Sequence, residues 1–117
     1  ARYPIYALTN GNADTTRTGI SQYLRGAISS AQVGASKPDP RMFQAALDQA
    51  GVQAHQCVHI GDHLDDDIKG ADAVGMHSIW VNLHKTQSVD KALQPSFEVT
   101  HLSEIVSTVA SIEATLI

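Results

Sequence analysis

The chain has 117 residues, of which 43% are hydrophobic and 17% charged, and its formal net charge is −4. This length predicts one compact domain, and the composition excludes the low hydrophobicity and high charge of a disordered chain. The acidic balance argues against binding to nucleic acid or to an anionic membrane, since either would require a basic face. A small molecule is therefore the expected partner.

The lone cysteine and the missing targeting signals favour the cytoplasm. Cys57 lies in an apolar run and has no second cysteine to pair with, so we interpret it as a structural thiol of a reducing compartment. No apolar run approaches the roughly 20 residues that a bilayer span requires. The chain begins with Ala1, and residues 3–8 already resemble a buried strand, so we expect the numbering to begin inside a domain.

Short apolar runs alternate with helical stretches along the chain, which is typical of a parallel sheet covered by helices on both faces. We expect strands over residues 5–8, 27–29, 57–60 and 78–81, and a weaker strand over 97–99. The clearest helix is predicted over residues 40–50, because Pro40 suits a first helical turn and Gly51 suits an end.

Two further helices are predicted from the spacing of apolar residues. One should begin near Asp66 and end at Gly75, and its inner face should carry Ile68, Ala71 and Val74. The last helix should direct four apolar side chains inward: Leu102, Ile105, Val106 and Val109. Residues 84–96 are expected to form a loop.

The first polar cluster follows the first expected strand, where open α/β sheets place their ligands. Thr9, Asn10 and Gly11 can offer a hydroxyl, an amide and backbone N–H groups to a phosphate oxygen. An ordinary strand-to-helix turn explains the same residues.

The second cluster surrounds Lys37. Pro38 and Pro40 stiffen the backbone after this lysine, so that its ammonium can be held against a phosphoryl group. The alternative is a solvated surface lysine. We interpret Asp39 as a helix N-cap.

The third cluster follows the strand expected over residues 57–60. Asp62, Asp65, Asp66 and Asp67 concentrate the hard oxygen ligands that magnesium prefers, although acidic residues also stabilise a helix N-terminus without any metal. Asp62 and Asp67 are the candidate ligands, with Asp66 in reserve. The six histidines form no metal-binding pattern, and only His63, beside Asp62, is expected to line the site.

The order of these clusters resembles the second, third and fourth motifs of the haloacid dehalogenase (HAD) superfamily. The matching residues are Thr9-Asn10, then Lys37-Pro38, then Gly61-Asp62 with Asp67 five positions after Asp62. The resemblance covers essentially the whole chain and is strongest to the branch with bacterial flavin mononucleotide phosphatases. It implies a three-layer, Rossmann-like (HAD-like) α/β fold, of which residues 1–117 form part of the core domain.

The resemblance also implies a role for each residue. Thr9, Lys37 and Asp62 would be catalytic, and Thr9, Asn10, Gly11 and Lys37 would bind phosphate. Asp62 would bind Mg²⁺ with Asp67 supporting the metal site, and the substrate would be a small phosphorylated metabolite. These roles suit phosphoryl transfer, which depends on positioning and on stabilisation of spread negative charge.

The chain departs from the family in lacking the first motif, whose aspartate is the nucleophile, and the helical cap. In the family the nucleophile-bearing strand lies between the strand that ends at Thr9 and the strand that ends at Gly61. We expect the two flanking strands to pair directly in its place. The alternatives are self-association and strand donation by a segment of another chain.

Three functions fit these residues. The first is a phosphate monoester hydrolase that uses an aspartyl-phosphate intermediate and is inactive as this chain alone. The second is a non-catalytic domain that binds a phosphorylated ligand or a partner. The third is a 2-haloacid dehalogenase, which the acidic, magnesium-type cluster disfavours.

Overall fold

The computed structural model describes residues 3–10, 24–85 and 97–115, and five parallel strands organise these segments. One sheet pairs β1 (Tyr6–Thr9) with β2 (Gly26–Ser29), and the other has the order β3 (Val58–Gly61), β4 (His77–Val81), β5 (Phe97–Val99). All five strands were predicted. The chain therefore has the expected α/β fold with parallel sheets and helices.

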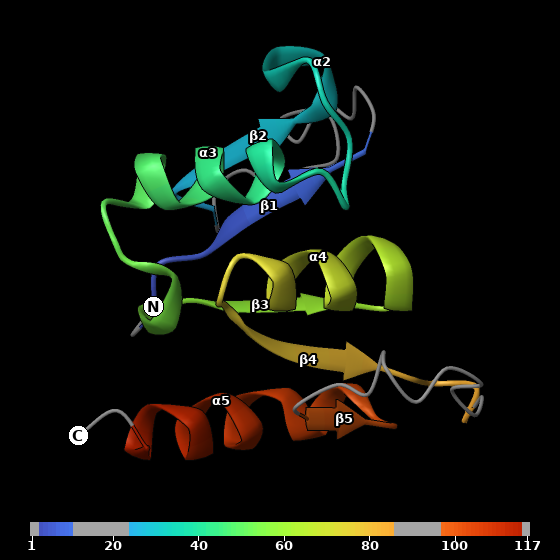
Figure 1. Cartoon of the computed structure of the whole chain (residues 1–117). Helices are drawn as coiled ribbons and strands as arrows, with labels where there is room; N and C mark the ends of the chain where they lie inside the picture. The colour runs from blue at the N-terminus through green and yellow to red at the C-terminus, as the bar shows by residue number, and fades with distance from the viewer. Residues whose placement is uncertain (1–2, 11–23, 86–96, 116–117) are drawn as a thin grey trace.

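The expected pairing between the first and third strands is wrong. The arrows of β1 and β3 point the same way in Figure 1, yet the two strands belong to separate sheets. The helix α3 (Pro40–Ala50) keeps β1 in the first sheet, because it packs on β1 and β2 and also on the following helix α4 (Gly70–Ala73). Tyr6 and Leu8 of β1 pack against this helix layer, so moving β1 onto β3 would break that core.

The helix α3 is built as its sequence predicts. Asp39 caps it through a hydrogen bond from the Arg41 N–H to Asp39 Oδ1 (2.9 Å), and Gly51 ends it in the left-handed conformation with φ 70°. Its buried face carries four residues of the larger core: Met42, Phe43, Ala46 and Leu47.

The second helix begins two residues earlier than predicted. A π-helical segment, η3 (Leu64–Lys69), precedes α4, because the His63 side chain acts as the N-cap and accepts from the Asp66 N–H at 3.1 Å. Ile68 and Ala71 are buried as predicted, and Gly75 follows with φ 88°. The early start places three aspartates in the first turn of this helix.

The last helix, α5 (Ile105–Ala114), covers the opposite face of the three-stranded sheet. Ile105, Val109 and Ile112 pack against Ile79 and Val99, in agreement with helical spacing. The predicted burial of Leu102 and Val106 is wrong, since they are 59% and 74% exposed. Leu102 lies in the preceding 3₁₀ turn η5 (Leu102–Glu104), and Val106 follows the inward-facing Ile105 by only one position.

Two short helical segments were not predicted, namely α2 (Ser30–Val33) and η2 (Ala54–Gln56). α2 has a capping box in which Ser29 and Gln32 exchange hydrogen bonds, and it ends at Gly34 with φ 81°. The chain then runs through the Lys37–Pro38 peptide, which is cis, into α3. Residues 86–96 of the loop expected over 84–96 lie outside the described residues.

Candidate active site

The predicted site residues occupy the carboxyl ends of β1 and β3. Thr9 is the last residue of β1, and Asn10 follows it directly. Gly61 is the last residue of β3, and Asp62 follows it. Gly11 lies outside the described residues, so its expected phosphate contact stays a prediction.

Asn10 fixes the backbone at Lys37. Its Oδ1 accepts from the Lys37 N–H at 2.6 Å, and its Nδ2 donates to the Lys37 carbonyl oxygen at 3.0 Å. The same Nδ2 also donates to Asp66 Oδ2 at 3.4 Å. One amide therefore joins the end of β1, the loop before α3 and the start of η3, which belong to both halves of the fold.

Asp67 receives hydrogen bonds from three groups. Its Oδ1 accepts from Lys37 Nζ at 2.7 Å and from His59 Nε2 at 2.9 Å, and its Oδ2 accepts from the His63 backbone N–H at 3.2 Å. The side chain of Asp67 is 7% exposed, and those of Lys37 and His59 are each 12% exposed. The lysine is thus held by a buried ion pair rather than solvated.

This environment stabilises the Asp67 carboxylate. Burial alone would raise the pKa of Asp67, but the hydrogen bonds from His59 and Lys37 and the charges of both groups hold it well below its usual range. Asp67 is therefore the ionised partner of Lys37 at neutral pH. Both carboxylate oxygens are engaged within the chain, which favours the supporting role that the family resemblance implies over the prediction of Asp67 as a metal ligand.

Gly61 allows this close arrangement. A Cβ built on Gly61 would overlap the carboxylate of Asp67, so the carboxylate can lie against the end of β3 only when residue 61 is glycine. Close packing of Asp67 therefore explains why residue 61 is a glycine. The missing side chain lets the start of η3 lie close to the end of β3.

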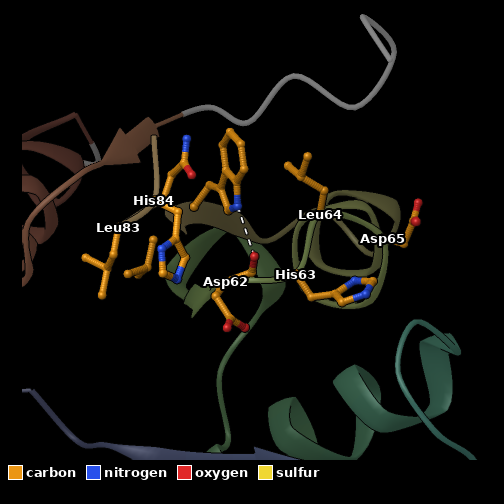
Figure 2. A pocket seen from close by; sticks show the side chains of 9 residues that line it. Asp62, His63, Leu64, Asp65, Leu83 and His84 are labelled. Atoms are coloured by element: carbon orange, nitrogen blue, oxygen red, sulfur yellow. Dashed lines mark hydrogen bonds between the residues drawn. The ribbon is translucent and has the colours of Figure 1, made fainter. Parts of the chain in front are cut away.

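Asp62 carries an exposed carboxylate at the rim of a pocket of about 240 Å³. Its backbone oxygen accepts from Trp80 Nε1 at 3.0 Å, marked by the dashed line in Figure 2, which ties the loop after β3 to β4. His63, Leu83 and His84 also line the pocket. Figure 2 shows the side chains of Asp62, His63 and Asp65 pointing in different directions.

The residues at the carboxyl ends of β1 and β3 offer a partial set of ligands for magnesium. Mg²⁺ is commonly bound by one or two carboxylates together with waters and phosphate oxygens, which matches the exposed carboxylate of Asp62. Within residues 3–10, 24–85 and 97–115, no group of three or more His, Cys, Asp and Glu side chains could hold a metal. Asp62 is the residue of this part of the chain that would hold the ion, and Asp67 and Lys37 would support it.

His59 was not recognised from the sequence as a site residue. It lies within an apolar strand, where an imidazole is more often structural, and no motif singles it out. The structure pairs it with Asp67, which also binds Lys37. Cys57 is half-buried and burial raises the pKa of its thiol, in agreement with a structural role. None of the described helices is long and apolar enough to cross a membrane.

Parallel strands with polar and charged groups after their carboxyl ends define a Rossmann-like α/β fold with a ligand site at that edge. Residues 34–105 match the family model described as HAD-hydrolase-like. The chain belongs to this family of hydrolases.

Named relatives include several phosphatases. The chain is 31% identical to the 5-amino-6-(5-phospho-D-ribitylamino)uracil phosphatase YigB of Escherichia coli strain K12, over 91% of this chain and 46% of that protein. It is 32% identical to the phosphoserine phosphatase of Thermus thermophilus, over 84% of this chain and 41% of that protein. The chain therefore spans about half the length of these curated relatives.

Solved structures agree on the fold. A 2-haloacid dehalogenase from Pseudomonas syringae pv. Tomato DC3000 superposes with a TM-score of 0.89 and 38% identity, over 93% of this chain and 47% of that chain. An HAD phosphatase from Thermococcus onnurineus superposes with a TM-score of 0.83 and 27% identity, over 92% of this chain and 50% of that chain.

Proposed function

We propose that this chain is part of a magnesium-dependent phosphate monoester hydrolase that acts on a small phosphorylated metabolite. The observation that carries the proposal is the buried Lys37–Asp67 ion pair, 2.7 Å long, at the edge that also carries Thr9 and Asp62. A lysine held rigidly at this edge can neutralise charge on a phosphoryl group without reorganising during the reaction. The phosphatases among the named relatives support the same substrate class.

Each residue has a distinct task in this proposal. The Thr9 hydroxyl donates to a phosphoryl oxygen, Lys37 offsets charge on the phosphoryl group, and Asn10 holds the Lys37 backbone in place. Asp62 would hold the magnesium ion, which when bound neutralises charge on the phosphate. Asp67 keeps Lys37 in position, since its two oxygens are already engaged.

The nucleophile must come from outside the described residues. We propose that an additional strand, placed between β1 and β3, carries an aspartate that attacks phosphorus and forms an aspartyl-phosphate, while the ester P–O bond breaks and the alcohol leaves after taking up a proton from water. Water then hydrolyses this intermediate and releases phosphate. The strand would be donated by another segment or chain, because β1 and β3 pair only with their outer neighbours in the described sheets.

The test compares the 117-residue chain with a polypeptide in which it is joined to a nucleophile-bearing segment. With p-nitrophenyl phosphate and Mg²⁺, we expect the joined polypeptide to release phosphate and the shorter chain to release none. Asp62→Asn and Lys37→Ala in the joined polypeptide should lower kcat by at least about 100-fold. Asp65→Asn, an exposed acid in the same segment, is the matched control.

Two outcomes would contradict the proposal. Turnover by the 117-residue chain that Asp62→Asn abolishes would remove the need for a second segment. A joined polypeptide that binds inorganic phosphate without turnover would instead favour the non-catalytic domain that binds a phosphorylated ligand.

A second candidate is a 2-haloacid dehalogenase, favoured by the name of the P. syringae structure at 38% identity. Chloride release from 2-chloropropionate by the joined polypeptide, without any phosphatase activity, would establish it. The exposed Asp62 and the neighbouring aspartates favour the phosphatase, because a dehalogenase has no phosphate charge for a cation to offset.

A further inference from the structure

His59 lies in a largely buried position where an apolar side chain would be expected. Its imidazole is 12% exposed and packs edge-on against the ring of Phe43, with ring centroids 5.1 Å apart and an angle of 81° between the planes. A leucine or phenylalanine would fill such a site without burying polar nitrogens. The imidazole Nε2 instead lies 2.9 Å from Asp67 Oδ1. Packing alone does not require this hydrogen bond.

The direction of this hydrogen bond follows from the charge of its partner. An ionised carboxylate can only accept, so the proton lies on Nε2 of His59 and is donated to Asp67 Oδ1. That oxygen is also the one that binds Lys37 Nζ at 2.7 Å. The His63 N–H holds the other oxygen, Oδ2, at 3.2 Å. His59 and His63 thus hold the carboxylate from two sides, which leaves it little freedom to rotate away from Lys37.

We propose that His59 is a positioning residue that sets the place of the Lys37 ammonium by fixing Asp67 Oδ1. The proposal rests on the proposed function, in which Lys37 stabilises the phosphoryl group. Without the imidazole N–H, Oδ1 has Lys37 as its remaining side-chain donor, and the pair can shift together. Displacing a charge-stabilising group by about 1 Å can cost on the order of 100-fold in rate.

The test uses three variants of the joined polypeptide described above. His59→Gln keeps an amide N–H near the position of Nε2, while His59→Leu keeps apolar volume and removes the donor. His77→Leu is the matched control, because His77 is also a strand histidine whose Nε2 contacts a backbone oxygen, that of His55, at 3.0 Å. His77 begins β4, at the opposite end of the sheet from the site.

We expect His59→Leu to lower kcat by roughly 10- to 100-fold with KM changed less than about threefold. His59→Gln should stay within about threefold of the parent, as should His77→Leu. Equal kcat values for His59→Leu and the parent would overturn the proposal. So would a His59→Gln variant as impaired as His59→Leu, since restoring a donor would then restore nothing.

A second readout separates this proposal from the proposed function. The ¹⁵N signal of the Lys37 ammonium, assigned with Lys37→Arg, should show slow hydrogen exchange in the parent and in His59→Gln, because the group is held in a buried pair. It should be lost to fast exchange in His59→Leu. A protected signal in His59→Leu overturns the positioning role even if phosphatase activity is found. Loss of the signal supports that role even if the enzyme acts on another substrate.

Discussion

At the scale of single residues, Asp67 has the largest electrostatic role in the described site. It accepts from Lys37, His59 and His63, and its pKa is held below its usual range in spite of burial. A carboxyl group whose folded-state pKa is lowered contributes stability above its unfolded pKa of about 4, and this contribution is lost as the pH falls through the folded value. The Lys37–Asp67 ion pair therefore makes the free energy of unfolding decrease as the pH falls into the acid range.

Replacing Asp67 with Asn tests this linkage. At pH 7 the substitution should lower the free energy of unfolding by about 3 to 5 kcal/mol, because it leaves the buried Lys37 ammonium without its counter-charge. The difference between parent and variant should shrink as the pH falls from about 5 toward 2, because the Asp67 carboxyl of the unfolded parent takes up a proton there while the folded parent stays ionised, which favours unfolding of the parent. Urea titrations at several pH values measure it. A difference that stays constant with pH would contradict the assigned pKa direction.

Gly61 gives a second prediction at this scale. Gly61→Ala places a methyl group where the Asp67 carboxylate lies, so the carboxylate or the start of η3 must move. We expect a loss of about 1 to 3 kcal/mol in unfolding free energy, together with weaker protection of the Lys37 ammonium. Thermal unfolding and ¹⁵N exchange measure the two effects. Ser36→Ala, at an exposed position beside Lys37, should change neither, and an unchanged Gly61→Ala variant would refute the packing explanation.

At the scale of elements, burial in α5 was predicted less well than the strands were. The spacing of Ile105 and Val109 was interpreted correctly, but Leu102 and Val106 are exposed. Ile112→Ala should cost about 2 to 5 kcal/mol, because Ile112 is 1% exposed, whereas Val106→Ala should stay within about 0.5 kcal/mol. Chemical denaturation of both variants checks this, and similar losses in the two would mean that α5 packs through another face.

The sequence predicted the strands because each is a short apolar run bounded by polar residues, and it predicted α3 because Asp39, Pro40 and Gly51 mark its ends. It also predicted that Lys37 and Asp67 would serve one site, through the order of the motifs. The roles of Asn10 and His59 could not be predicted in this way. Each depends on a contact between segments far apart in the chain, and neither residue type is specific for such a contact.

At the scale of the whole molecule, the helices and the Asn10 and Asp67 hydrogen bonds hold the two parallel sheets together, and no strand ladder joins the sheets within residues 3–10, 24–85 and 97–115. β1 and β3 carry partly exposed apolar residues, with Ile5 just before β1 at 49% and Ile60 at 40%. Strand edges that lack a partner are templates for pairing with another strand. The additional strand that we propose between β1 and β3 would find such an edge on each side.

Hydrogen exchange tests this directly on the 117-residue chain. Each strand of a sheet offers its backbone groups to both sides, so about half of the amides of β1 and β3 should face no partner and exchange fast. The amides of β4 pair on both sides, with β3 and β5, and should be protected throughout. Adding a peptide with one apolar strand should slow exchange at β1 and β3 and raise the unfolding midpoint, while β4 stays unchanged.

Slow exchange along both strands without peptide, at concentrations where the chain is monomeric, would mean that β1 and β3 already pair in solution. The same protection appearing only as the chain associates would show that a second copy supplies the strand.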